Sequence, residues 1–581
     1  MNKLSPECYT DSYKIGMSML HAFDYAGHQV DVLSAYSNFT PRKNAYMEFS
    51  KLSDNKIVVY GTYDTFLTIH NMYEEFFSTD ANTVKSRIER RLKSHFGSIT
   101  DHAKYIVDMM QLHELGYLPI RVKAIEEGTR YNIGLPVFTV EATVAGFGWL
   151  VNYLETVTSG LIWPMINTAT KVEQFYLQAK HYGSVSAPKE VLDMWLPICV
   201  HEFGMRGYRG PEDQIRTSSA HSLFFLGSDT IGVLDYFESL GMANIDEEPV
   251  AVSVRASEHA DITRMLSIFR EIAKAAIAKD GAGATLMIEG DIEVLAEAVL
   301  NRTELYVLRY FVKNSTGIMS YVSDTEDYYR LINKYAAELK EDILARQARE
   351  DGQPPIFVFR PDSSRRTPLT VICGYKVVDV PYSVESLNDD ECFTVDGKYY
   401  LYEEGVKVEI SKEEAEGSLV ALWNTFGGSE VETEVGLMKL INPAVGLIYG
   451  EAISQSHQKE IYERMIEMGF SAVNVLMGKG SYASLENSTR DLFSMTYKQT
   501  NSAIKIDDKV VSLSQQKKPL GDISKKSARG FLRIEKEGED YVMYQDQTPE
   551  QKNKGELKDL YANGLFVNTP TLNTIKDKYN A

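Results

Sequence analysis

The sequence predicts an irregular α/β barrel with a second, mixed α/β domain and two inserts. Helical and strand-like patterns alternate along the chain, which is typical of parallel strands connected by helices. Several buried-looking strands run directly into polar turns, and 581 residues are too many for a single hydrophobic core. Parallel α/β folds bind ligands at the carboxyl ends of their strands, so a site is expected at these turns.

Two long segments have the apolar spacing of helices, with apolar residues every three or four positions in 161–183 and in 261–280. Shorter segments have the character of buried strands that end on Asp, Arg, Glu, Gly or Ser: GIMSYVSD (317–324), PIFVFRPDSS (355–364), VGLIYGEAIS (445–454) and AVNVLMGKGSY (472–482). Such ends in succession favour one shared pocket, and a barrel is the natural container for it.

The barrel is expected over residues 149–487, and residues 1–148 together with 488–581 are expected to form the mixed α/β domain. One insert, at about 263–312, is mostly helical in pattern. In the other, at about 380–435, alternation around Asp396-Gly397 predicts a β-hairpin.

Composition narrows the classes of function. The formal charge of −20 disfavours nucleic acids and anionic membranes as general partners. The 4 cysteines have no metal-type spacing, which favours unpaired thiols in a reducing compartment. No apolar run approaches about 18 residues, and the N-terminal stretch has no signal-like apolar core, so a cytoplasmic location is expected.

Two strand ends carry residues suited to phosphate. The turn at 478–481, Gly-Lys-Gly-Ser, lets backbone N–H groups approach a phosphate, although a tight turn alone has the same sequence. In FRPDSS, Arg360 and Asp362 lie two positions apart at a strand end. Together they could hold a phosphate, through the arginine, and a ribose hydroxyl or a magnesium ion, through the aspartate. A surface ion pair is the alternative for this second pair.

Further stretches gather polar groups against the acidic background. Residues 201–230, HEFGMRGYRGPEDQIRTSSAHSLFFLGSDT, combine Gly-flanked arginines, a Phe between an acid and a Gly, and a closing Asp. Residues 515–530, QQKKPLGDISKKSARG, are basic, with a solvated loop as the alternative. In SVRASEH (253–259), Glu258 could orient the imidazole of His259, although a lone histidine is more often structural.

Taken in order, these motifs resemble those of the nicotinamide phosphoribosyltransferases, within the type II phosphoribosyltransferase family. The matching stretches are TDSYK (10–14), SNFTPRK (37–43), VVYG (58–61), GYLPIRVKA (116–124), LPVFTVE (135–141), WLVNYLET (149–156), FGMRG with SSAH and GSDT, SVRASEH, VSD, FRPDS, STRD (488–491) and KKPLGDISKKSARG. They cover most of residues 8–262, 317–375 and 440–535, and leave the inserts and the tail uncovered.

The resemblance implies a binding site for nicotinamide. Phe203 would stack on one face of the pyridine ring, and Tyr13 of the second subunit of a homodimer would stack on the other. Asp229 would accept a hydrogen bond from the carboxamide N–H₂. Arg206 and Arg360 would hold the carbonyl side and the phosphoribosyl group.

The resemblance also implies a site for 5-phosphoribosyl 1-diphosphate. Asp362 would meet the ribose and the magnesium–diphosphate, with Asp324 nearby. Residues of both subunits would hold the phosphates: Gly450, Gly480 and Ser481 the 5′-phosphate, helped by Arg490 of the second subunit, and Arg42 and Lys498 across the dimer the diphosphate.

By the same resemblance, the pyridine nitrogen displaces diphosphate and gives nicotinamide mononucleotide for NAD biosynthesis. Mg²⁺ would be the cofactor and ATP a co-substrate that phosphorylates His259, with Asp11, Lys517 and Lys525 on the ATP side of the site. Glu451 stands where the family has Asp for the ribose hydroxyls, and GKGSY is one residue longer before STRD than the family's glycine-rich run.

Three alternatives stay open. The nearest is a nicotinate phosphoribosyltransferase, although Asp229 would repel the carboxylate of that substrate. The second is a catalytically silent protein that binds nucleotide or acts through its inserts. The third is an unrelated phosphate-binding barrel, which would not explain TDSYK or the basic residues supplied across a dimer.

Overall fold

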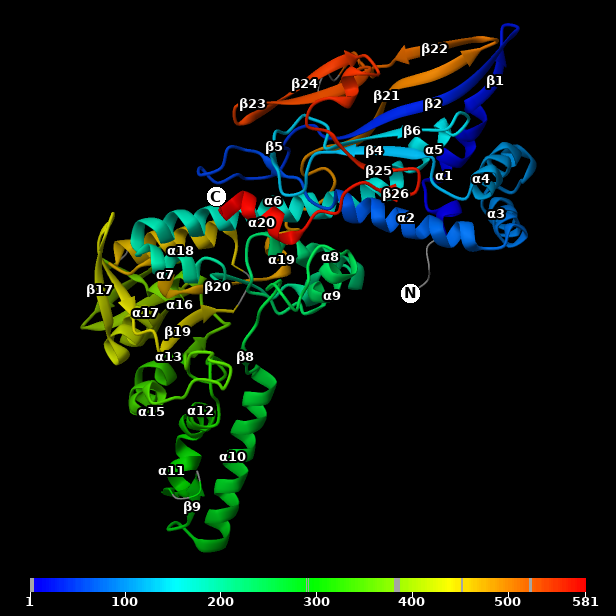
Figure 1. Cartoon of the computed structure of the whole chain (residues 1–581). Coiled ribbons are helices and arrows are strands. Elements are labelled where there is room, and N and C mark those ends of the chain that lie inside the picture. The colour runs from blue at the N-terminus through cyan, green and yellow to red at the C-terminus, as the bar shows by residue number, and fades with distance from the viewer. Residues whose placement is uncertain are drawn as a thin grey trace.

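The computed structural model describes residues 5–288, 290, 292–380, 387–450, 453–521 and 525–580. Figure 1 shows two bodies joined along the long helix α6 (Glu155–Ser186), and an arm that projects from the lower body. Glu451 lies outside the described residues.

The lower body is a parallel barrel. Its described strands pair in parallel in the order β7 (Val200–Glu202), β20 (Leu476–Lys479), β19 (Val445–Tyr449), β12 (Phe357–Arg360), β11 (Met319–Val322) and β8 (Arg255–Ala256). Two bridges, Glu202–Ser228 and Gly227–Val252, connect the edge strand β7 to the segment that leads into β8. The sheet therefore closes on itself, and the predicted irregular α/β barrel is confirmed.

Helices cover the outside of the barrel strands. The predicted helices at 161–183 and 261–280 are confirmed as parts of α6 and of α10 (His259–Asp280). Around the barrel, α6 packs against α18 (Gln455–Glu467), α18 packs against α16 (Pro368–Cys373), and α16 packs against α17 (Lys412–Phe426). The core between strands and helices holds the buried side chains of Tyr321, Phe357 and Leu447.

The segment 472–482 differs from the predicted strand. Its first residues form a 3₁₀ turn, Ala472–Asn474, because the hydroxyl of Ser471 accepts a hydrogen bond from the N–H of Val473 at 3.4 Å. Strand β20 therefore begins only at Leu476.

The upper body contains an antiparallel sheet whose strands come from both ends of the chain. Its described strands are β22 (Lys509–Ser514), β21 (Met495–Ile506), β2 (His28–Pro41), β6 (Phe138–Ala142), β4 (Ile120–Ala124), β25 (Lys558–Ala562) and β26 (Leu565–Phe566), with β1 (Ala22–Tyr25) beside β2. Helices α2 (Thr62–Ser78), α3 (Ala81–Phe96) and α4 (Ala103–Leu115) lie beside this sheet (Figure 1). The boundaries of the two domains stay a prediction.

The two inserts take different forms. In the first, α10, β9 (Thr285–Ile288), β10 (Ile292–Leu295), α11 (Ala296–Asn301) and α12 (Thr303–Lys313) build the arm (Figure 1). In the second, β13 (Lys376–Val378), β14 (Glu391–Val395), β15 (Lys398–Glu403) and β16 (Val406–Ile410) form a small sheet. The predicted hairpin is confirmed, since Asp396 and Gly397 have φ of 51° and 77° and Val395 pairs with Lys398.

The remaining described elements connect or cover these parts. The helices are α1 (Ser12–Gly16), α5 (Gly148–Tyr153), α7 (Lys189–Trp195), α8 (Pro211–Ser219), α9 (Gly232–Ser239), α13 (Tyr328–Arg330), α14 (Ala336–Glu338), α15 (Lys340–Leu344), α19 (Ser481–Leu485) and α20 (Leu572–Asn580). The strands are β3 (Ile57–Val58), β5 (Arg130–Tyr131), β17 (Gly428–Thr433), β18 (Gly436–Ile441), β23 (Phe531–Glu537) and β24 (Asp540–Gln547).

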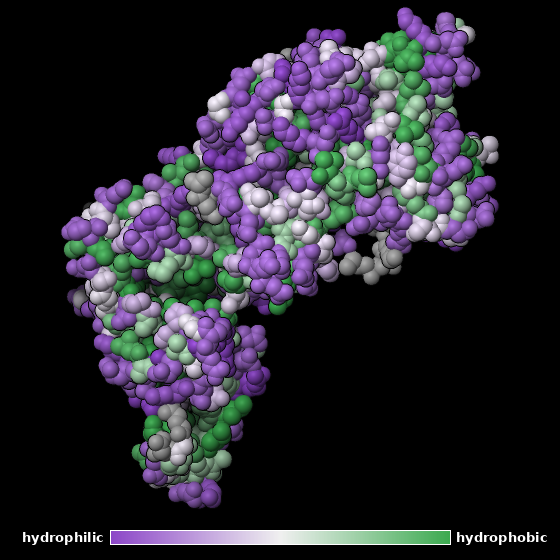
Figure 2. All heavy atoms as spheres, in the orientation of Figure 1, coloured by the Kyte–Doolittle hydropathy of each residue, from purple (hydrophilic) through white to green (hydrophobic). Residues whose placement is uncertain are grey.

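The surface is mostly hydrophilic. Figure 2 shows that hydrophobic residues gather in a hollow of the barrel body and along the arm, while hydrophilic residues cover most of the rest of this face. Among the helices of the described ranges, none is both long enough and apolar enough to cross a lipid bilayer. The thiols of Cys8, Cys199, Cys373 and Cys392 are unpaired, as predicted.

Candidate active site

The barrel brings one group of the predicted site residues to a single rim. Because all the strands are parallel, their carboxyl ends lie at the same end of the barrel. The rim residues follow the strands one by one: Phe203 after β7, Asp229 after the bridging residues 227–228, His259 after β8, Asp324 after β11, Asp362 after β12, Gly450 after β19, and Gly480 with Ser481 after β20. Segments far apart in the sequence thus contribute to one site.

His259 and two aspartates form the acidic side of the rim. The Nε2 atom of His259 lies 2.9 Å from Oδ1 of Asp324, and its Nδ1 atom lies 3.9 Å from Oδ2 of Asp362. The side chain of Asp324 is 5% exposed, whereas that of His259 is 45% exposed. The other oxygen of Asp324 accepts hydrogen bonds from the backbone N–H groups of Asp362 and Ser363, at 2.9 and 2.7 Å. An exposed imidazole is therefore held by a buried, anchored carboxylate.

This arrangement corrects the expected role of Glu258. The carboxylate that orients the imidazole belongs to Asp324, which lies 65 positions away in the sequence. Glu258 instead occupies the N-cap position of α10, with extended backbone angles.

Arg360 and Gly450 shape the surroundings of Asp362. The guanidinium of Arg360 donates to the backbone carbonyl of Ser257 at 2.5 Å, and its Nε lies 3.6 Å from Oδ1 of Asp362. A Cβ atom at position 450 would lie 1.9 Å from the same Oδ1. Glycine is therefore required at this strand end, because any side chain would displace the carboxylate.

Elsewhere on the rim, Phe203 and Asp229 lie beside a histidine and a serine that the sequence did not single out. One oxygen of Asp229 accepts hydrogen bonds from Nε2 of His201 at 2.9 Å and from Oγ of Ser253 at 2.5 Å. The rings of His201 and Phe203 lie 4.6 Å apart. The alternation of side chains along β7 was the available signal, because residues two apart in a strand share a face.

The electrostatics of Asp229 favour the carboxylate. Burial alone would raise its pKa, but the hydrogen bonds from His201 and Ser253, together with the charge of Arg360, bring the pKa below its ordinary value. An ionised carboxylate only accepts hydrogen bonds, so the group suits a ligand N–H₂ and disfavours a ligand carboxylate.

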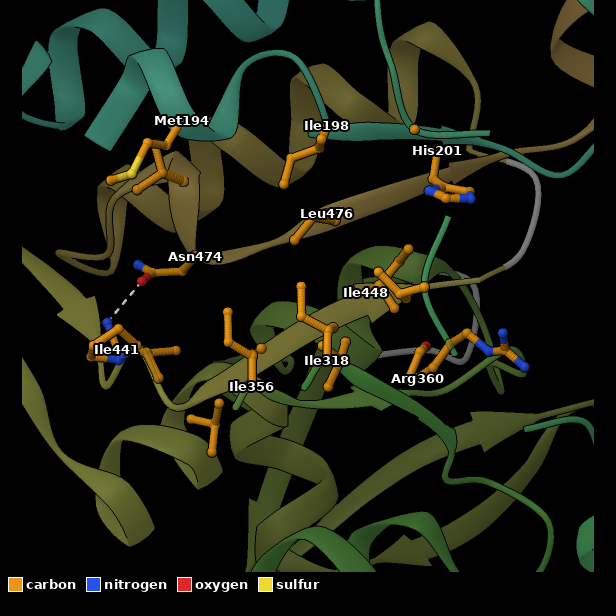
Figure 3. A pocket seen from close by; sticks show the side chains of 18 of the residues that line it. Met194, Ile198, His201, Ile318, Ile356, Arg360, Ile441, Ile448, Asn474 and Leu476 are labelled. Atoms are coloured by element: carbon orange, nitrogen blue, oxygen red, sulfur yellow. Dashed lines mark hydrogen bonds between the residues drawn. The ribbon is translucent and has the colours of Figure 1, made fainter. Parts of the chain in front are cut away.

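A cavity of about 500 Å³ extends from this rim into the barrel. Figure 3 shows His201 and Arg360 at one end, Met194 and Ile441 at the other, and the aliphatic side chains of Ile318, Ile356, Ile448 and Leu476 between them. The lining is mostly apolar apart from the few polar groups at the rim, which is the usual composition of a site for a small organic ring.

The turn after β20 lies against the turn after β7. Gly480 precedes the short helix α19, of which Ser481 is the first residue. A Cβ atom at position 207 would lie 1.8 Å from Oγ of Ser481, and one at position 204 would lie 2.9 Å from its backbone nitrogen. The glycines of FGMRG therefore allow the two turns to touch.

A second group of predicted residues lies on the upper body. Arg42, Lys498 and Lys525 line another pocket, of about 250 Å³, which has no residue in common with the barrel cavity as far as the described parts of the chain show. Burial lowers the pKa of Lys498, Glu155 opposes this shift, and the charges of Lys517 and Arg42 add to it. The basic residues are therefore gathered locally in an acidic protein.

The remaining predicted residues are on the surface or near the first helix. The side chain of Arg490 is 59% exposed, and Tyr13 is 61% exposed. Arg206 is exposed on the turn Met205–Gly207. The carboxylate of Asp11 accepts a hydrogen bond from the hydroxyl of Thr156 at 2.7 Å. Within one chain, these residues do not line the barrel cavity in the described structure.

Comparison with known proteins decides the family. A nicotinamide phosphoribosyltransferase of Acinetobacter baylyi is 30% identical to this chain over 546 residues, which cover 94% of this chain and 92% of the relative. The chain belongs to the nicotinamide phosphoribosyltransferase family. Another member, from Mycoplasma pneumoniae, is 24% identical over 432 residues, or 74% of each chain.

The resemblance inferred from the motifs is thus confirmed, and the family is one of pentosyltransferases. The alignment with the Acinetobacter baylyi relative covers 94% of this chain, which is more than the regions that carry the motifs. The similarity therefore also extends into the inserts or the tail. No family model matches the chain. Among solved structures, a nicotinate-nucleotide pyrophosphorylase from Pyrococcus furiosus aligns with a TM-score of 0.47 at 14% identity, covering 99% of this chain and 94% of that one.

Proposed function

We propose that this protein forms nicotinamide mononucleotide and diphosphate from nicotinamide and 5-phosphoribosyl 1-diphosphate, in NAD biosynthesis. The observation that carries the proposal is the ionised Asp229 beside Phe203 at the mouth of an apolar cavity, on the same barrel rim as Arg360 and Asp362. A flat pyridine ring suits this mouth, and a phosphoribosyl group suits the glycine turns and the arginine beside it.

The chemistry requires positioning more than proton transfer. The pyridine nitrogen of nicotinamide carries a free lone pair at neutral pH, so it attacks C1 of the ribose without a general base. The C–N bond forms as the C–O bond to diphosphate breaks, and diphosphate leaves with the electron pair. Phe203 and Asp229 would fix the ring, while the rim would stabilise the positive charge that develops on the sugar.

The carboxylates of the rim fit a magnesium ion that arrives with its diphosphate. Among the described residues, no group of three or more His, Cys, Asp or Glu side chains is arranged to hold a metal ion by itself. Mg²⁺ usually combines one or two protein carboxylates with substrate phosphates. Asp362, at the rim and 31% exposed, would supply such an oxygen. The ion would neutralise charge on the leaving diphosphate.

His259 is proposed to accept the γ-phosphoryl group of ATP. Asp324 would accept a hydrogen bond from the Nε2–H group of His259, which leaves the lone pair of the neutral ring on Nδ1. Nδ1 would then attack the γ-phosphorus, and ADP would leave. The exposure of the ring supports access by ATP. Asp11, Lys517 and Lys525 would contact the ATP side of the site.

The donor phosphates need more cations than one rim supplies. A pocket on the upper body is lined by Arg42, Lys498 and Lys525. Tyr13, in the N-terminal part of the chain that belongs to the same body, is exposed. We therefore propose a two-fold homodimer in which these residues, with Arg490, complete the barrel site of the other subunit. The reaction would take place in the cytoplasm.

The direct test compares two substrates. Purified protein, 5-phosphoribosyl 1-diphosphate and Mg²⁺ are mixed with nicotinamide or with nicotinate, with and without ATP, and products are separated by chromatography. Nicotinamide mononucleotide should form, with nicotinate used far less efficiently and ATP accelerating the reaction. Preference for nicotinate would favour the alternative substrate, and no transfer to either ring would contradict the proposal.

A further inference from the structure

A buried chain of polar side chains lies beneath the rim and takes no part in the proposed chemistry. Glu202 and Lys479 are the last residues of the neighbouring strands β7 and β20, and they are paired in register. Glu202 is 0% exposed and Lys479 is 1% exposed. Burying a carboxylate and an ammonium group is unfavourable unless both are well satisfied by hydrogen bonds.

Two hydroxyl groups connect these charges. Nζ of Lys479 donates to Oγ of Ser484 at 2.8 Å, and the hydroxyl oxygen of Tyr208 lies 3.2 Å from that Oγ and 3.1 Å from Oε1 of Glu202. A carboxylate only accepts and an ammonium only donates. The direction is therefore fixed: Lys479 donates to Ser484, Ser484 to Tyr208, and Tyr208 to Glu202. Bonds in such a chain polarise and strengthen one another.

At its carboxylate end, the chain holds the residues proposed to bind the pyridine ring. Oε1 of Glu202 accepts the backbone N–H of Gly204 at 2.8 Å, which fixes the turn directly after Phe203. Oε2 accepts the hydroxyl of Thr230 at 2.5 Å, and the backbone carbonyl of Glu202 accepts the N–H of Asp229 at 3.0 Å. One buried side chain thus anchors both turns that would hold nicotinamide.

At its ammonium end, the chain holds the turn proposed to bind the 5′-phosphate. Lys479 directly precedes Gly480 and Ser481, and Ser484 lies in the helix that follows. The backbone carbonyl of Lys479 accepts the N–H of Phe203 at 2.9 Å. The two turns are therefore tied together by backbone contact and by the polar chain below them.

We infer that Glu202, Tyr208, Ser484 and Lys479 form a positioning device that sets the spacing between the ring-binding turn and the phosphate-binding turn. This inference rests on the proposed function and adds residues that touch neither substrate. Attack requires the pyridine nitrogen and C1 of the ribose within about 3–3.5 Å, and a displacement of about 1 Å can slow such a step about 100-fold. A polar chain with one allowed direction suits this task, because it has a single low-energy geometry.

The inference predicts a specific kinetic signature. Breaking the chain leaves each turn's own contacts to its substrate in place, so both KM values should change less than about 3-fold, while kcat falls about 10- to 100-fold. A role in stability alone would instead lower the unfolding temperature and leave kcat of the folded enzyme unchanged.

Tyr208→Phe and Ser484→Ala each remove one hydroxyl from the chain. The matched control is Tyr182→Phe, which removes a hydrogen bond from Tyr182 to Oε1 of Glu463 at 2.9 Å on helices away from the rim. Thermal unfolding is measured for all variants, and kcat and both KM values are measured with nicotinamide and the donor. Because the two changes cut one chain, the double variant should be little slower than either single variant.

The outcomes separate the inference from the proposed function. If the unmutated protein forms no nicotinamide mononucleotide, the function is wrong. If it does form this product, the kcat values of the two single variants decide. The positioning role is overturned if both values lie within about 2-fold of the kcat of the control variant, which is about the precision of such comparisons. A variant that fails to fold leaves the decision to the other, since each breaks the same chain at a different link.

Discussion

Replacing the carboxylate of Asp229 by an amide tests the substrate preference. In the structure, one oxygen of Asp229 is used by His201 and Ser253, and the side chain is 45% exposed, so a ligand can reach the group. A hydrogen bond to a charged group contributes about 1.5–3 kcal/mol. Since 1.4 kcal/mol corresponds to tenfold, Asp229→Asn should lower kcat/KM for nicotinamide about 10- to 150-fold.

The same substitution should help nicotinate. Two carboxylates about 4 Å apart repel by about 1 kcal/mol in water and about 4 kcal/mol near a protein surface. At the observed exposure we take about 2 kcal/mol, so removing the charge of Asp229 should raise the use of nicotinate about 30-fold. The preference for nicotinamide should therefore narrow by more than about 100-fold in total.

The assay measures kcat/KM for both rings at saturating donor. Asp351→Asn is the control, because Asp351 is an exposed carboxylate paired with Arg349 away from the barrel rim. It should leave both values unchanged. The reasoning is refuted if Asp229→Asn prefers nicotinamide as strongly as the unmutated protein does.

Three further predictions concern assembly, ATP and pH. Mixing inactive Phe203→Ala and Tyr13→Ala proteins should restore up to about a quarter of the activity, because half of the randomly mixed dimers contain one intact site out of two. Subunit exchange is followed by mass spectrometry, and exchange without any recovery of activity would contradict shared sites. His259→Ala should abolish ATP stimulation and the acid-labile phosphate seen by intact mass, while leaving a slow ATP-independent transfer; full stimulation in the variant would make the histidine structural. Burial lowers the pKa of Lys171 to about 8, so the folded state binds fewer protons than the unfolded state between about pH 8 and pH 10.4. Stability should therefore rise relative to Lys171→Met across this window in pH-dependent thermal melts, and a constant difference between the two proteins would contradict it.

The sequence reveals the rim but not how its members are held. The strand ends at Asp324, Asp362 and Gly450 could be predicted because a short apolar run followed by polar residues is a local signal. The residues that close the predicted barrel could not be identified, since the bridges at 227–228 and at Val252 are too short to have a period.

Partners that are distant in the sequence were also beyond local reasoning. Glu258 is adjacent to His259 in the chain, yet the hydrogen bond goes to Asp324, because the parallel pairing of β8 and β11 brings their ends together. In the same way, Glu202 and Lys479 meet only through the pairing of β7 and β20. Spacing along one chain cannot show such contacts.

A crystal structure of the protein with nicotinamide mononucleotide bound tests the central claim most directly. The pyridine ring should stack on Phe203 with its carboxamide nitrogen about 3 Å from the carboxylate of Asp229, and the 5′-phosphate should lie at Gly480 and Ser481. Tyr13 of the second subunit should cover the other face of the ring. A nucleotide bound only in the basic pocket of the upper body, with the barrel mouth empty, would contradict the account.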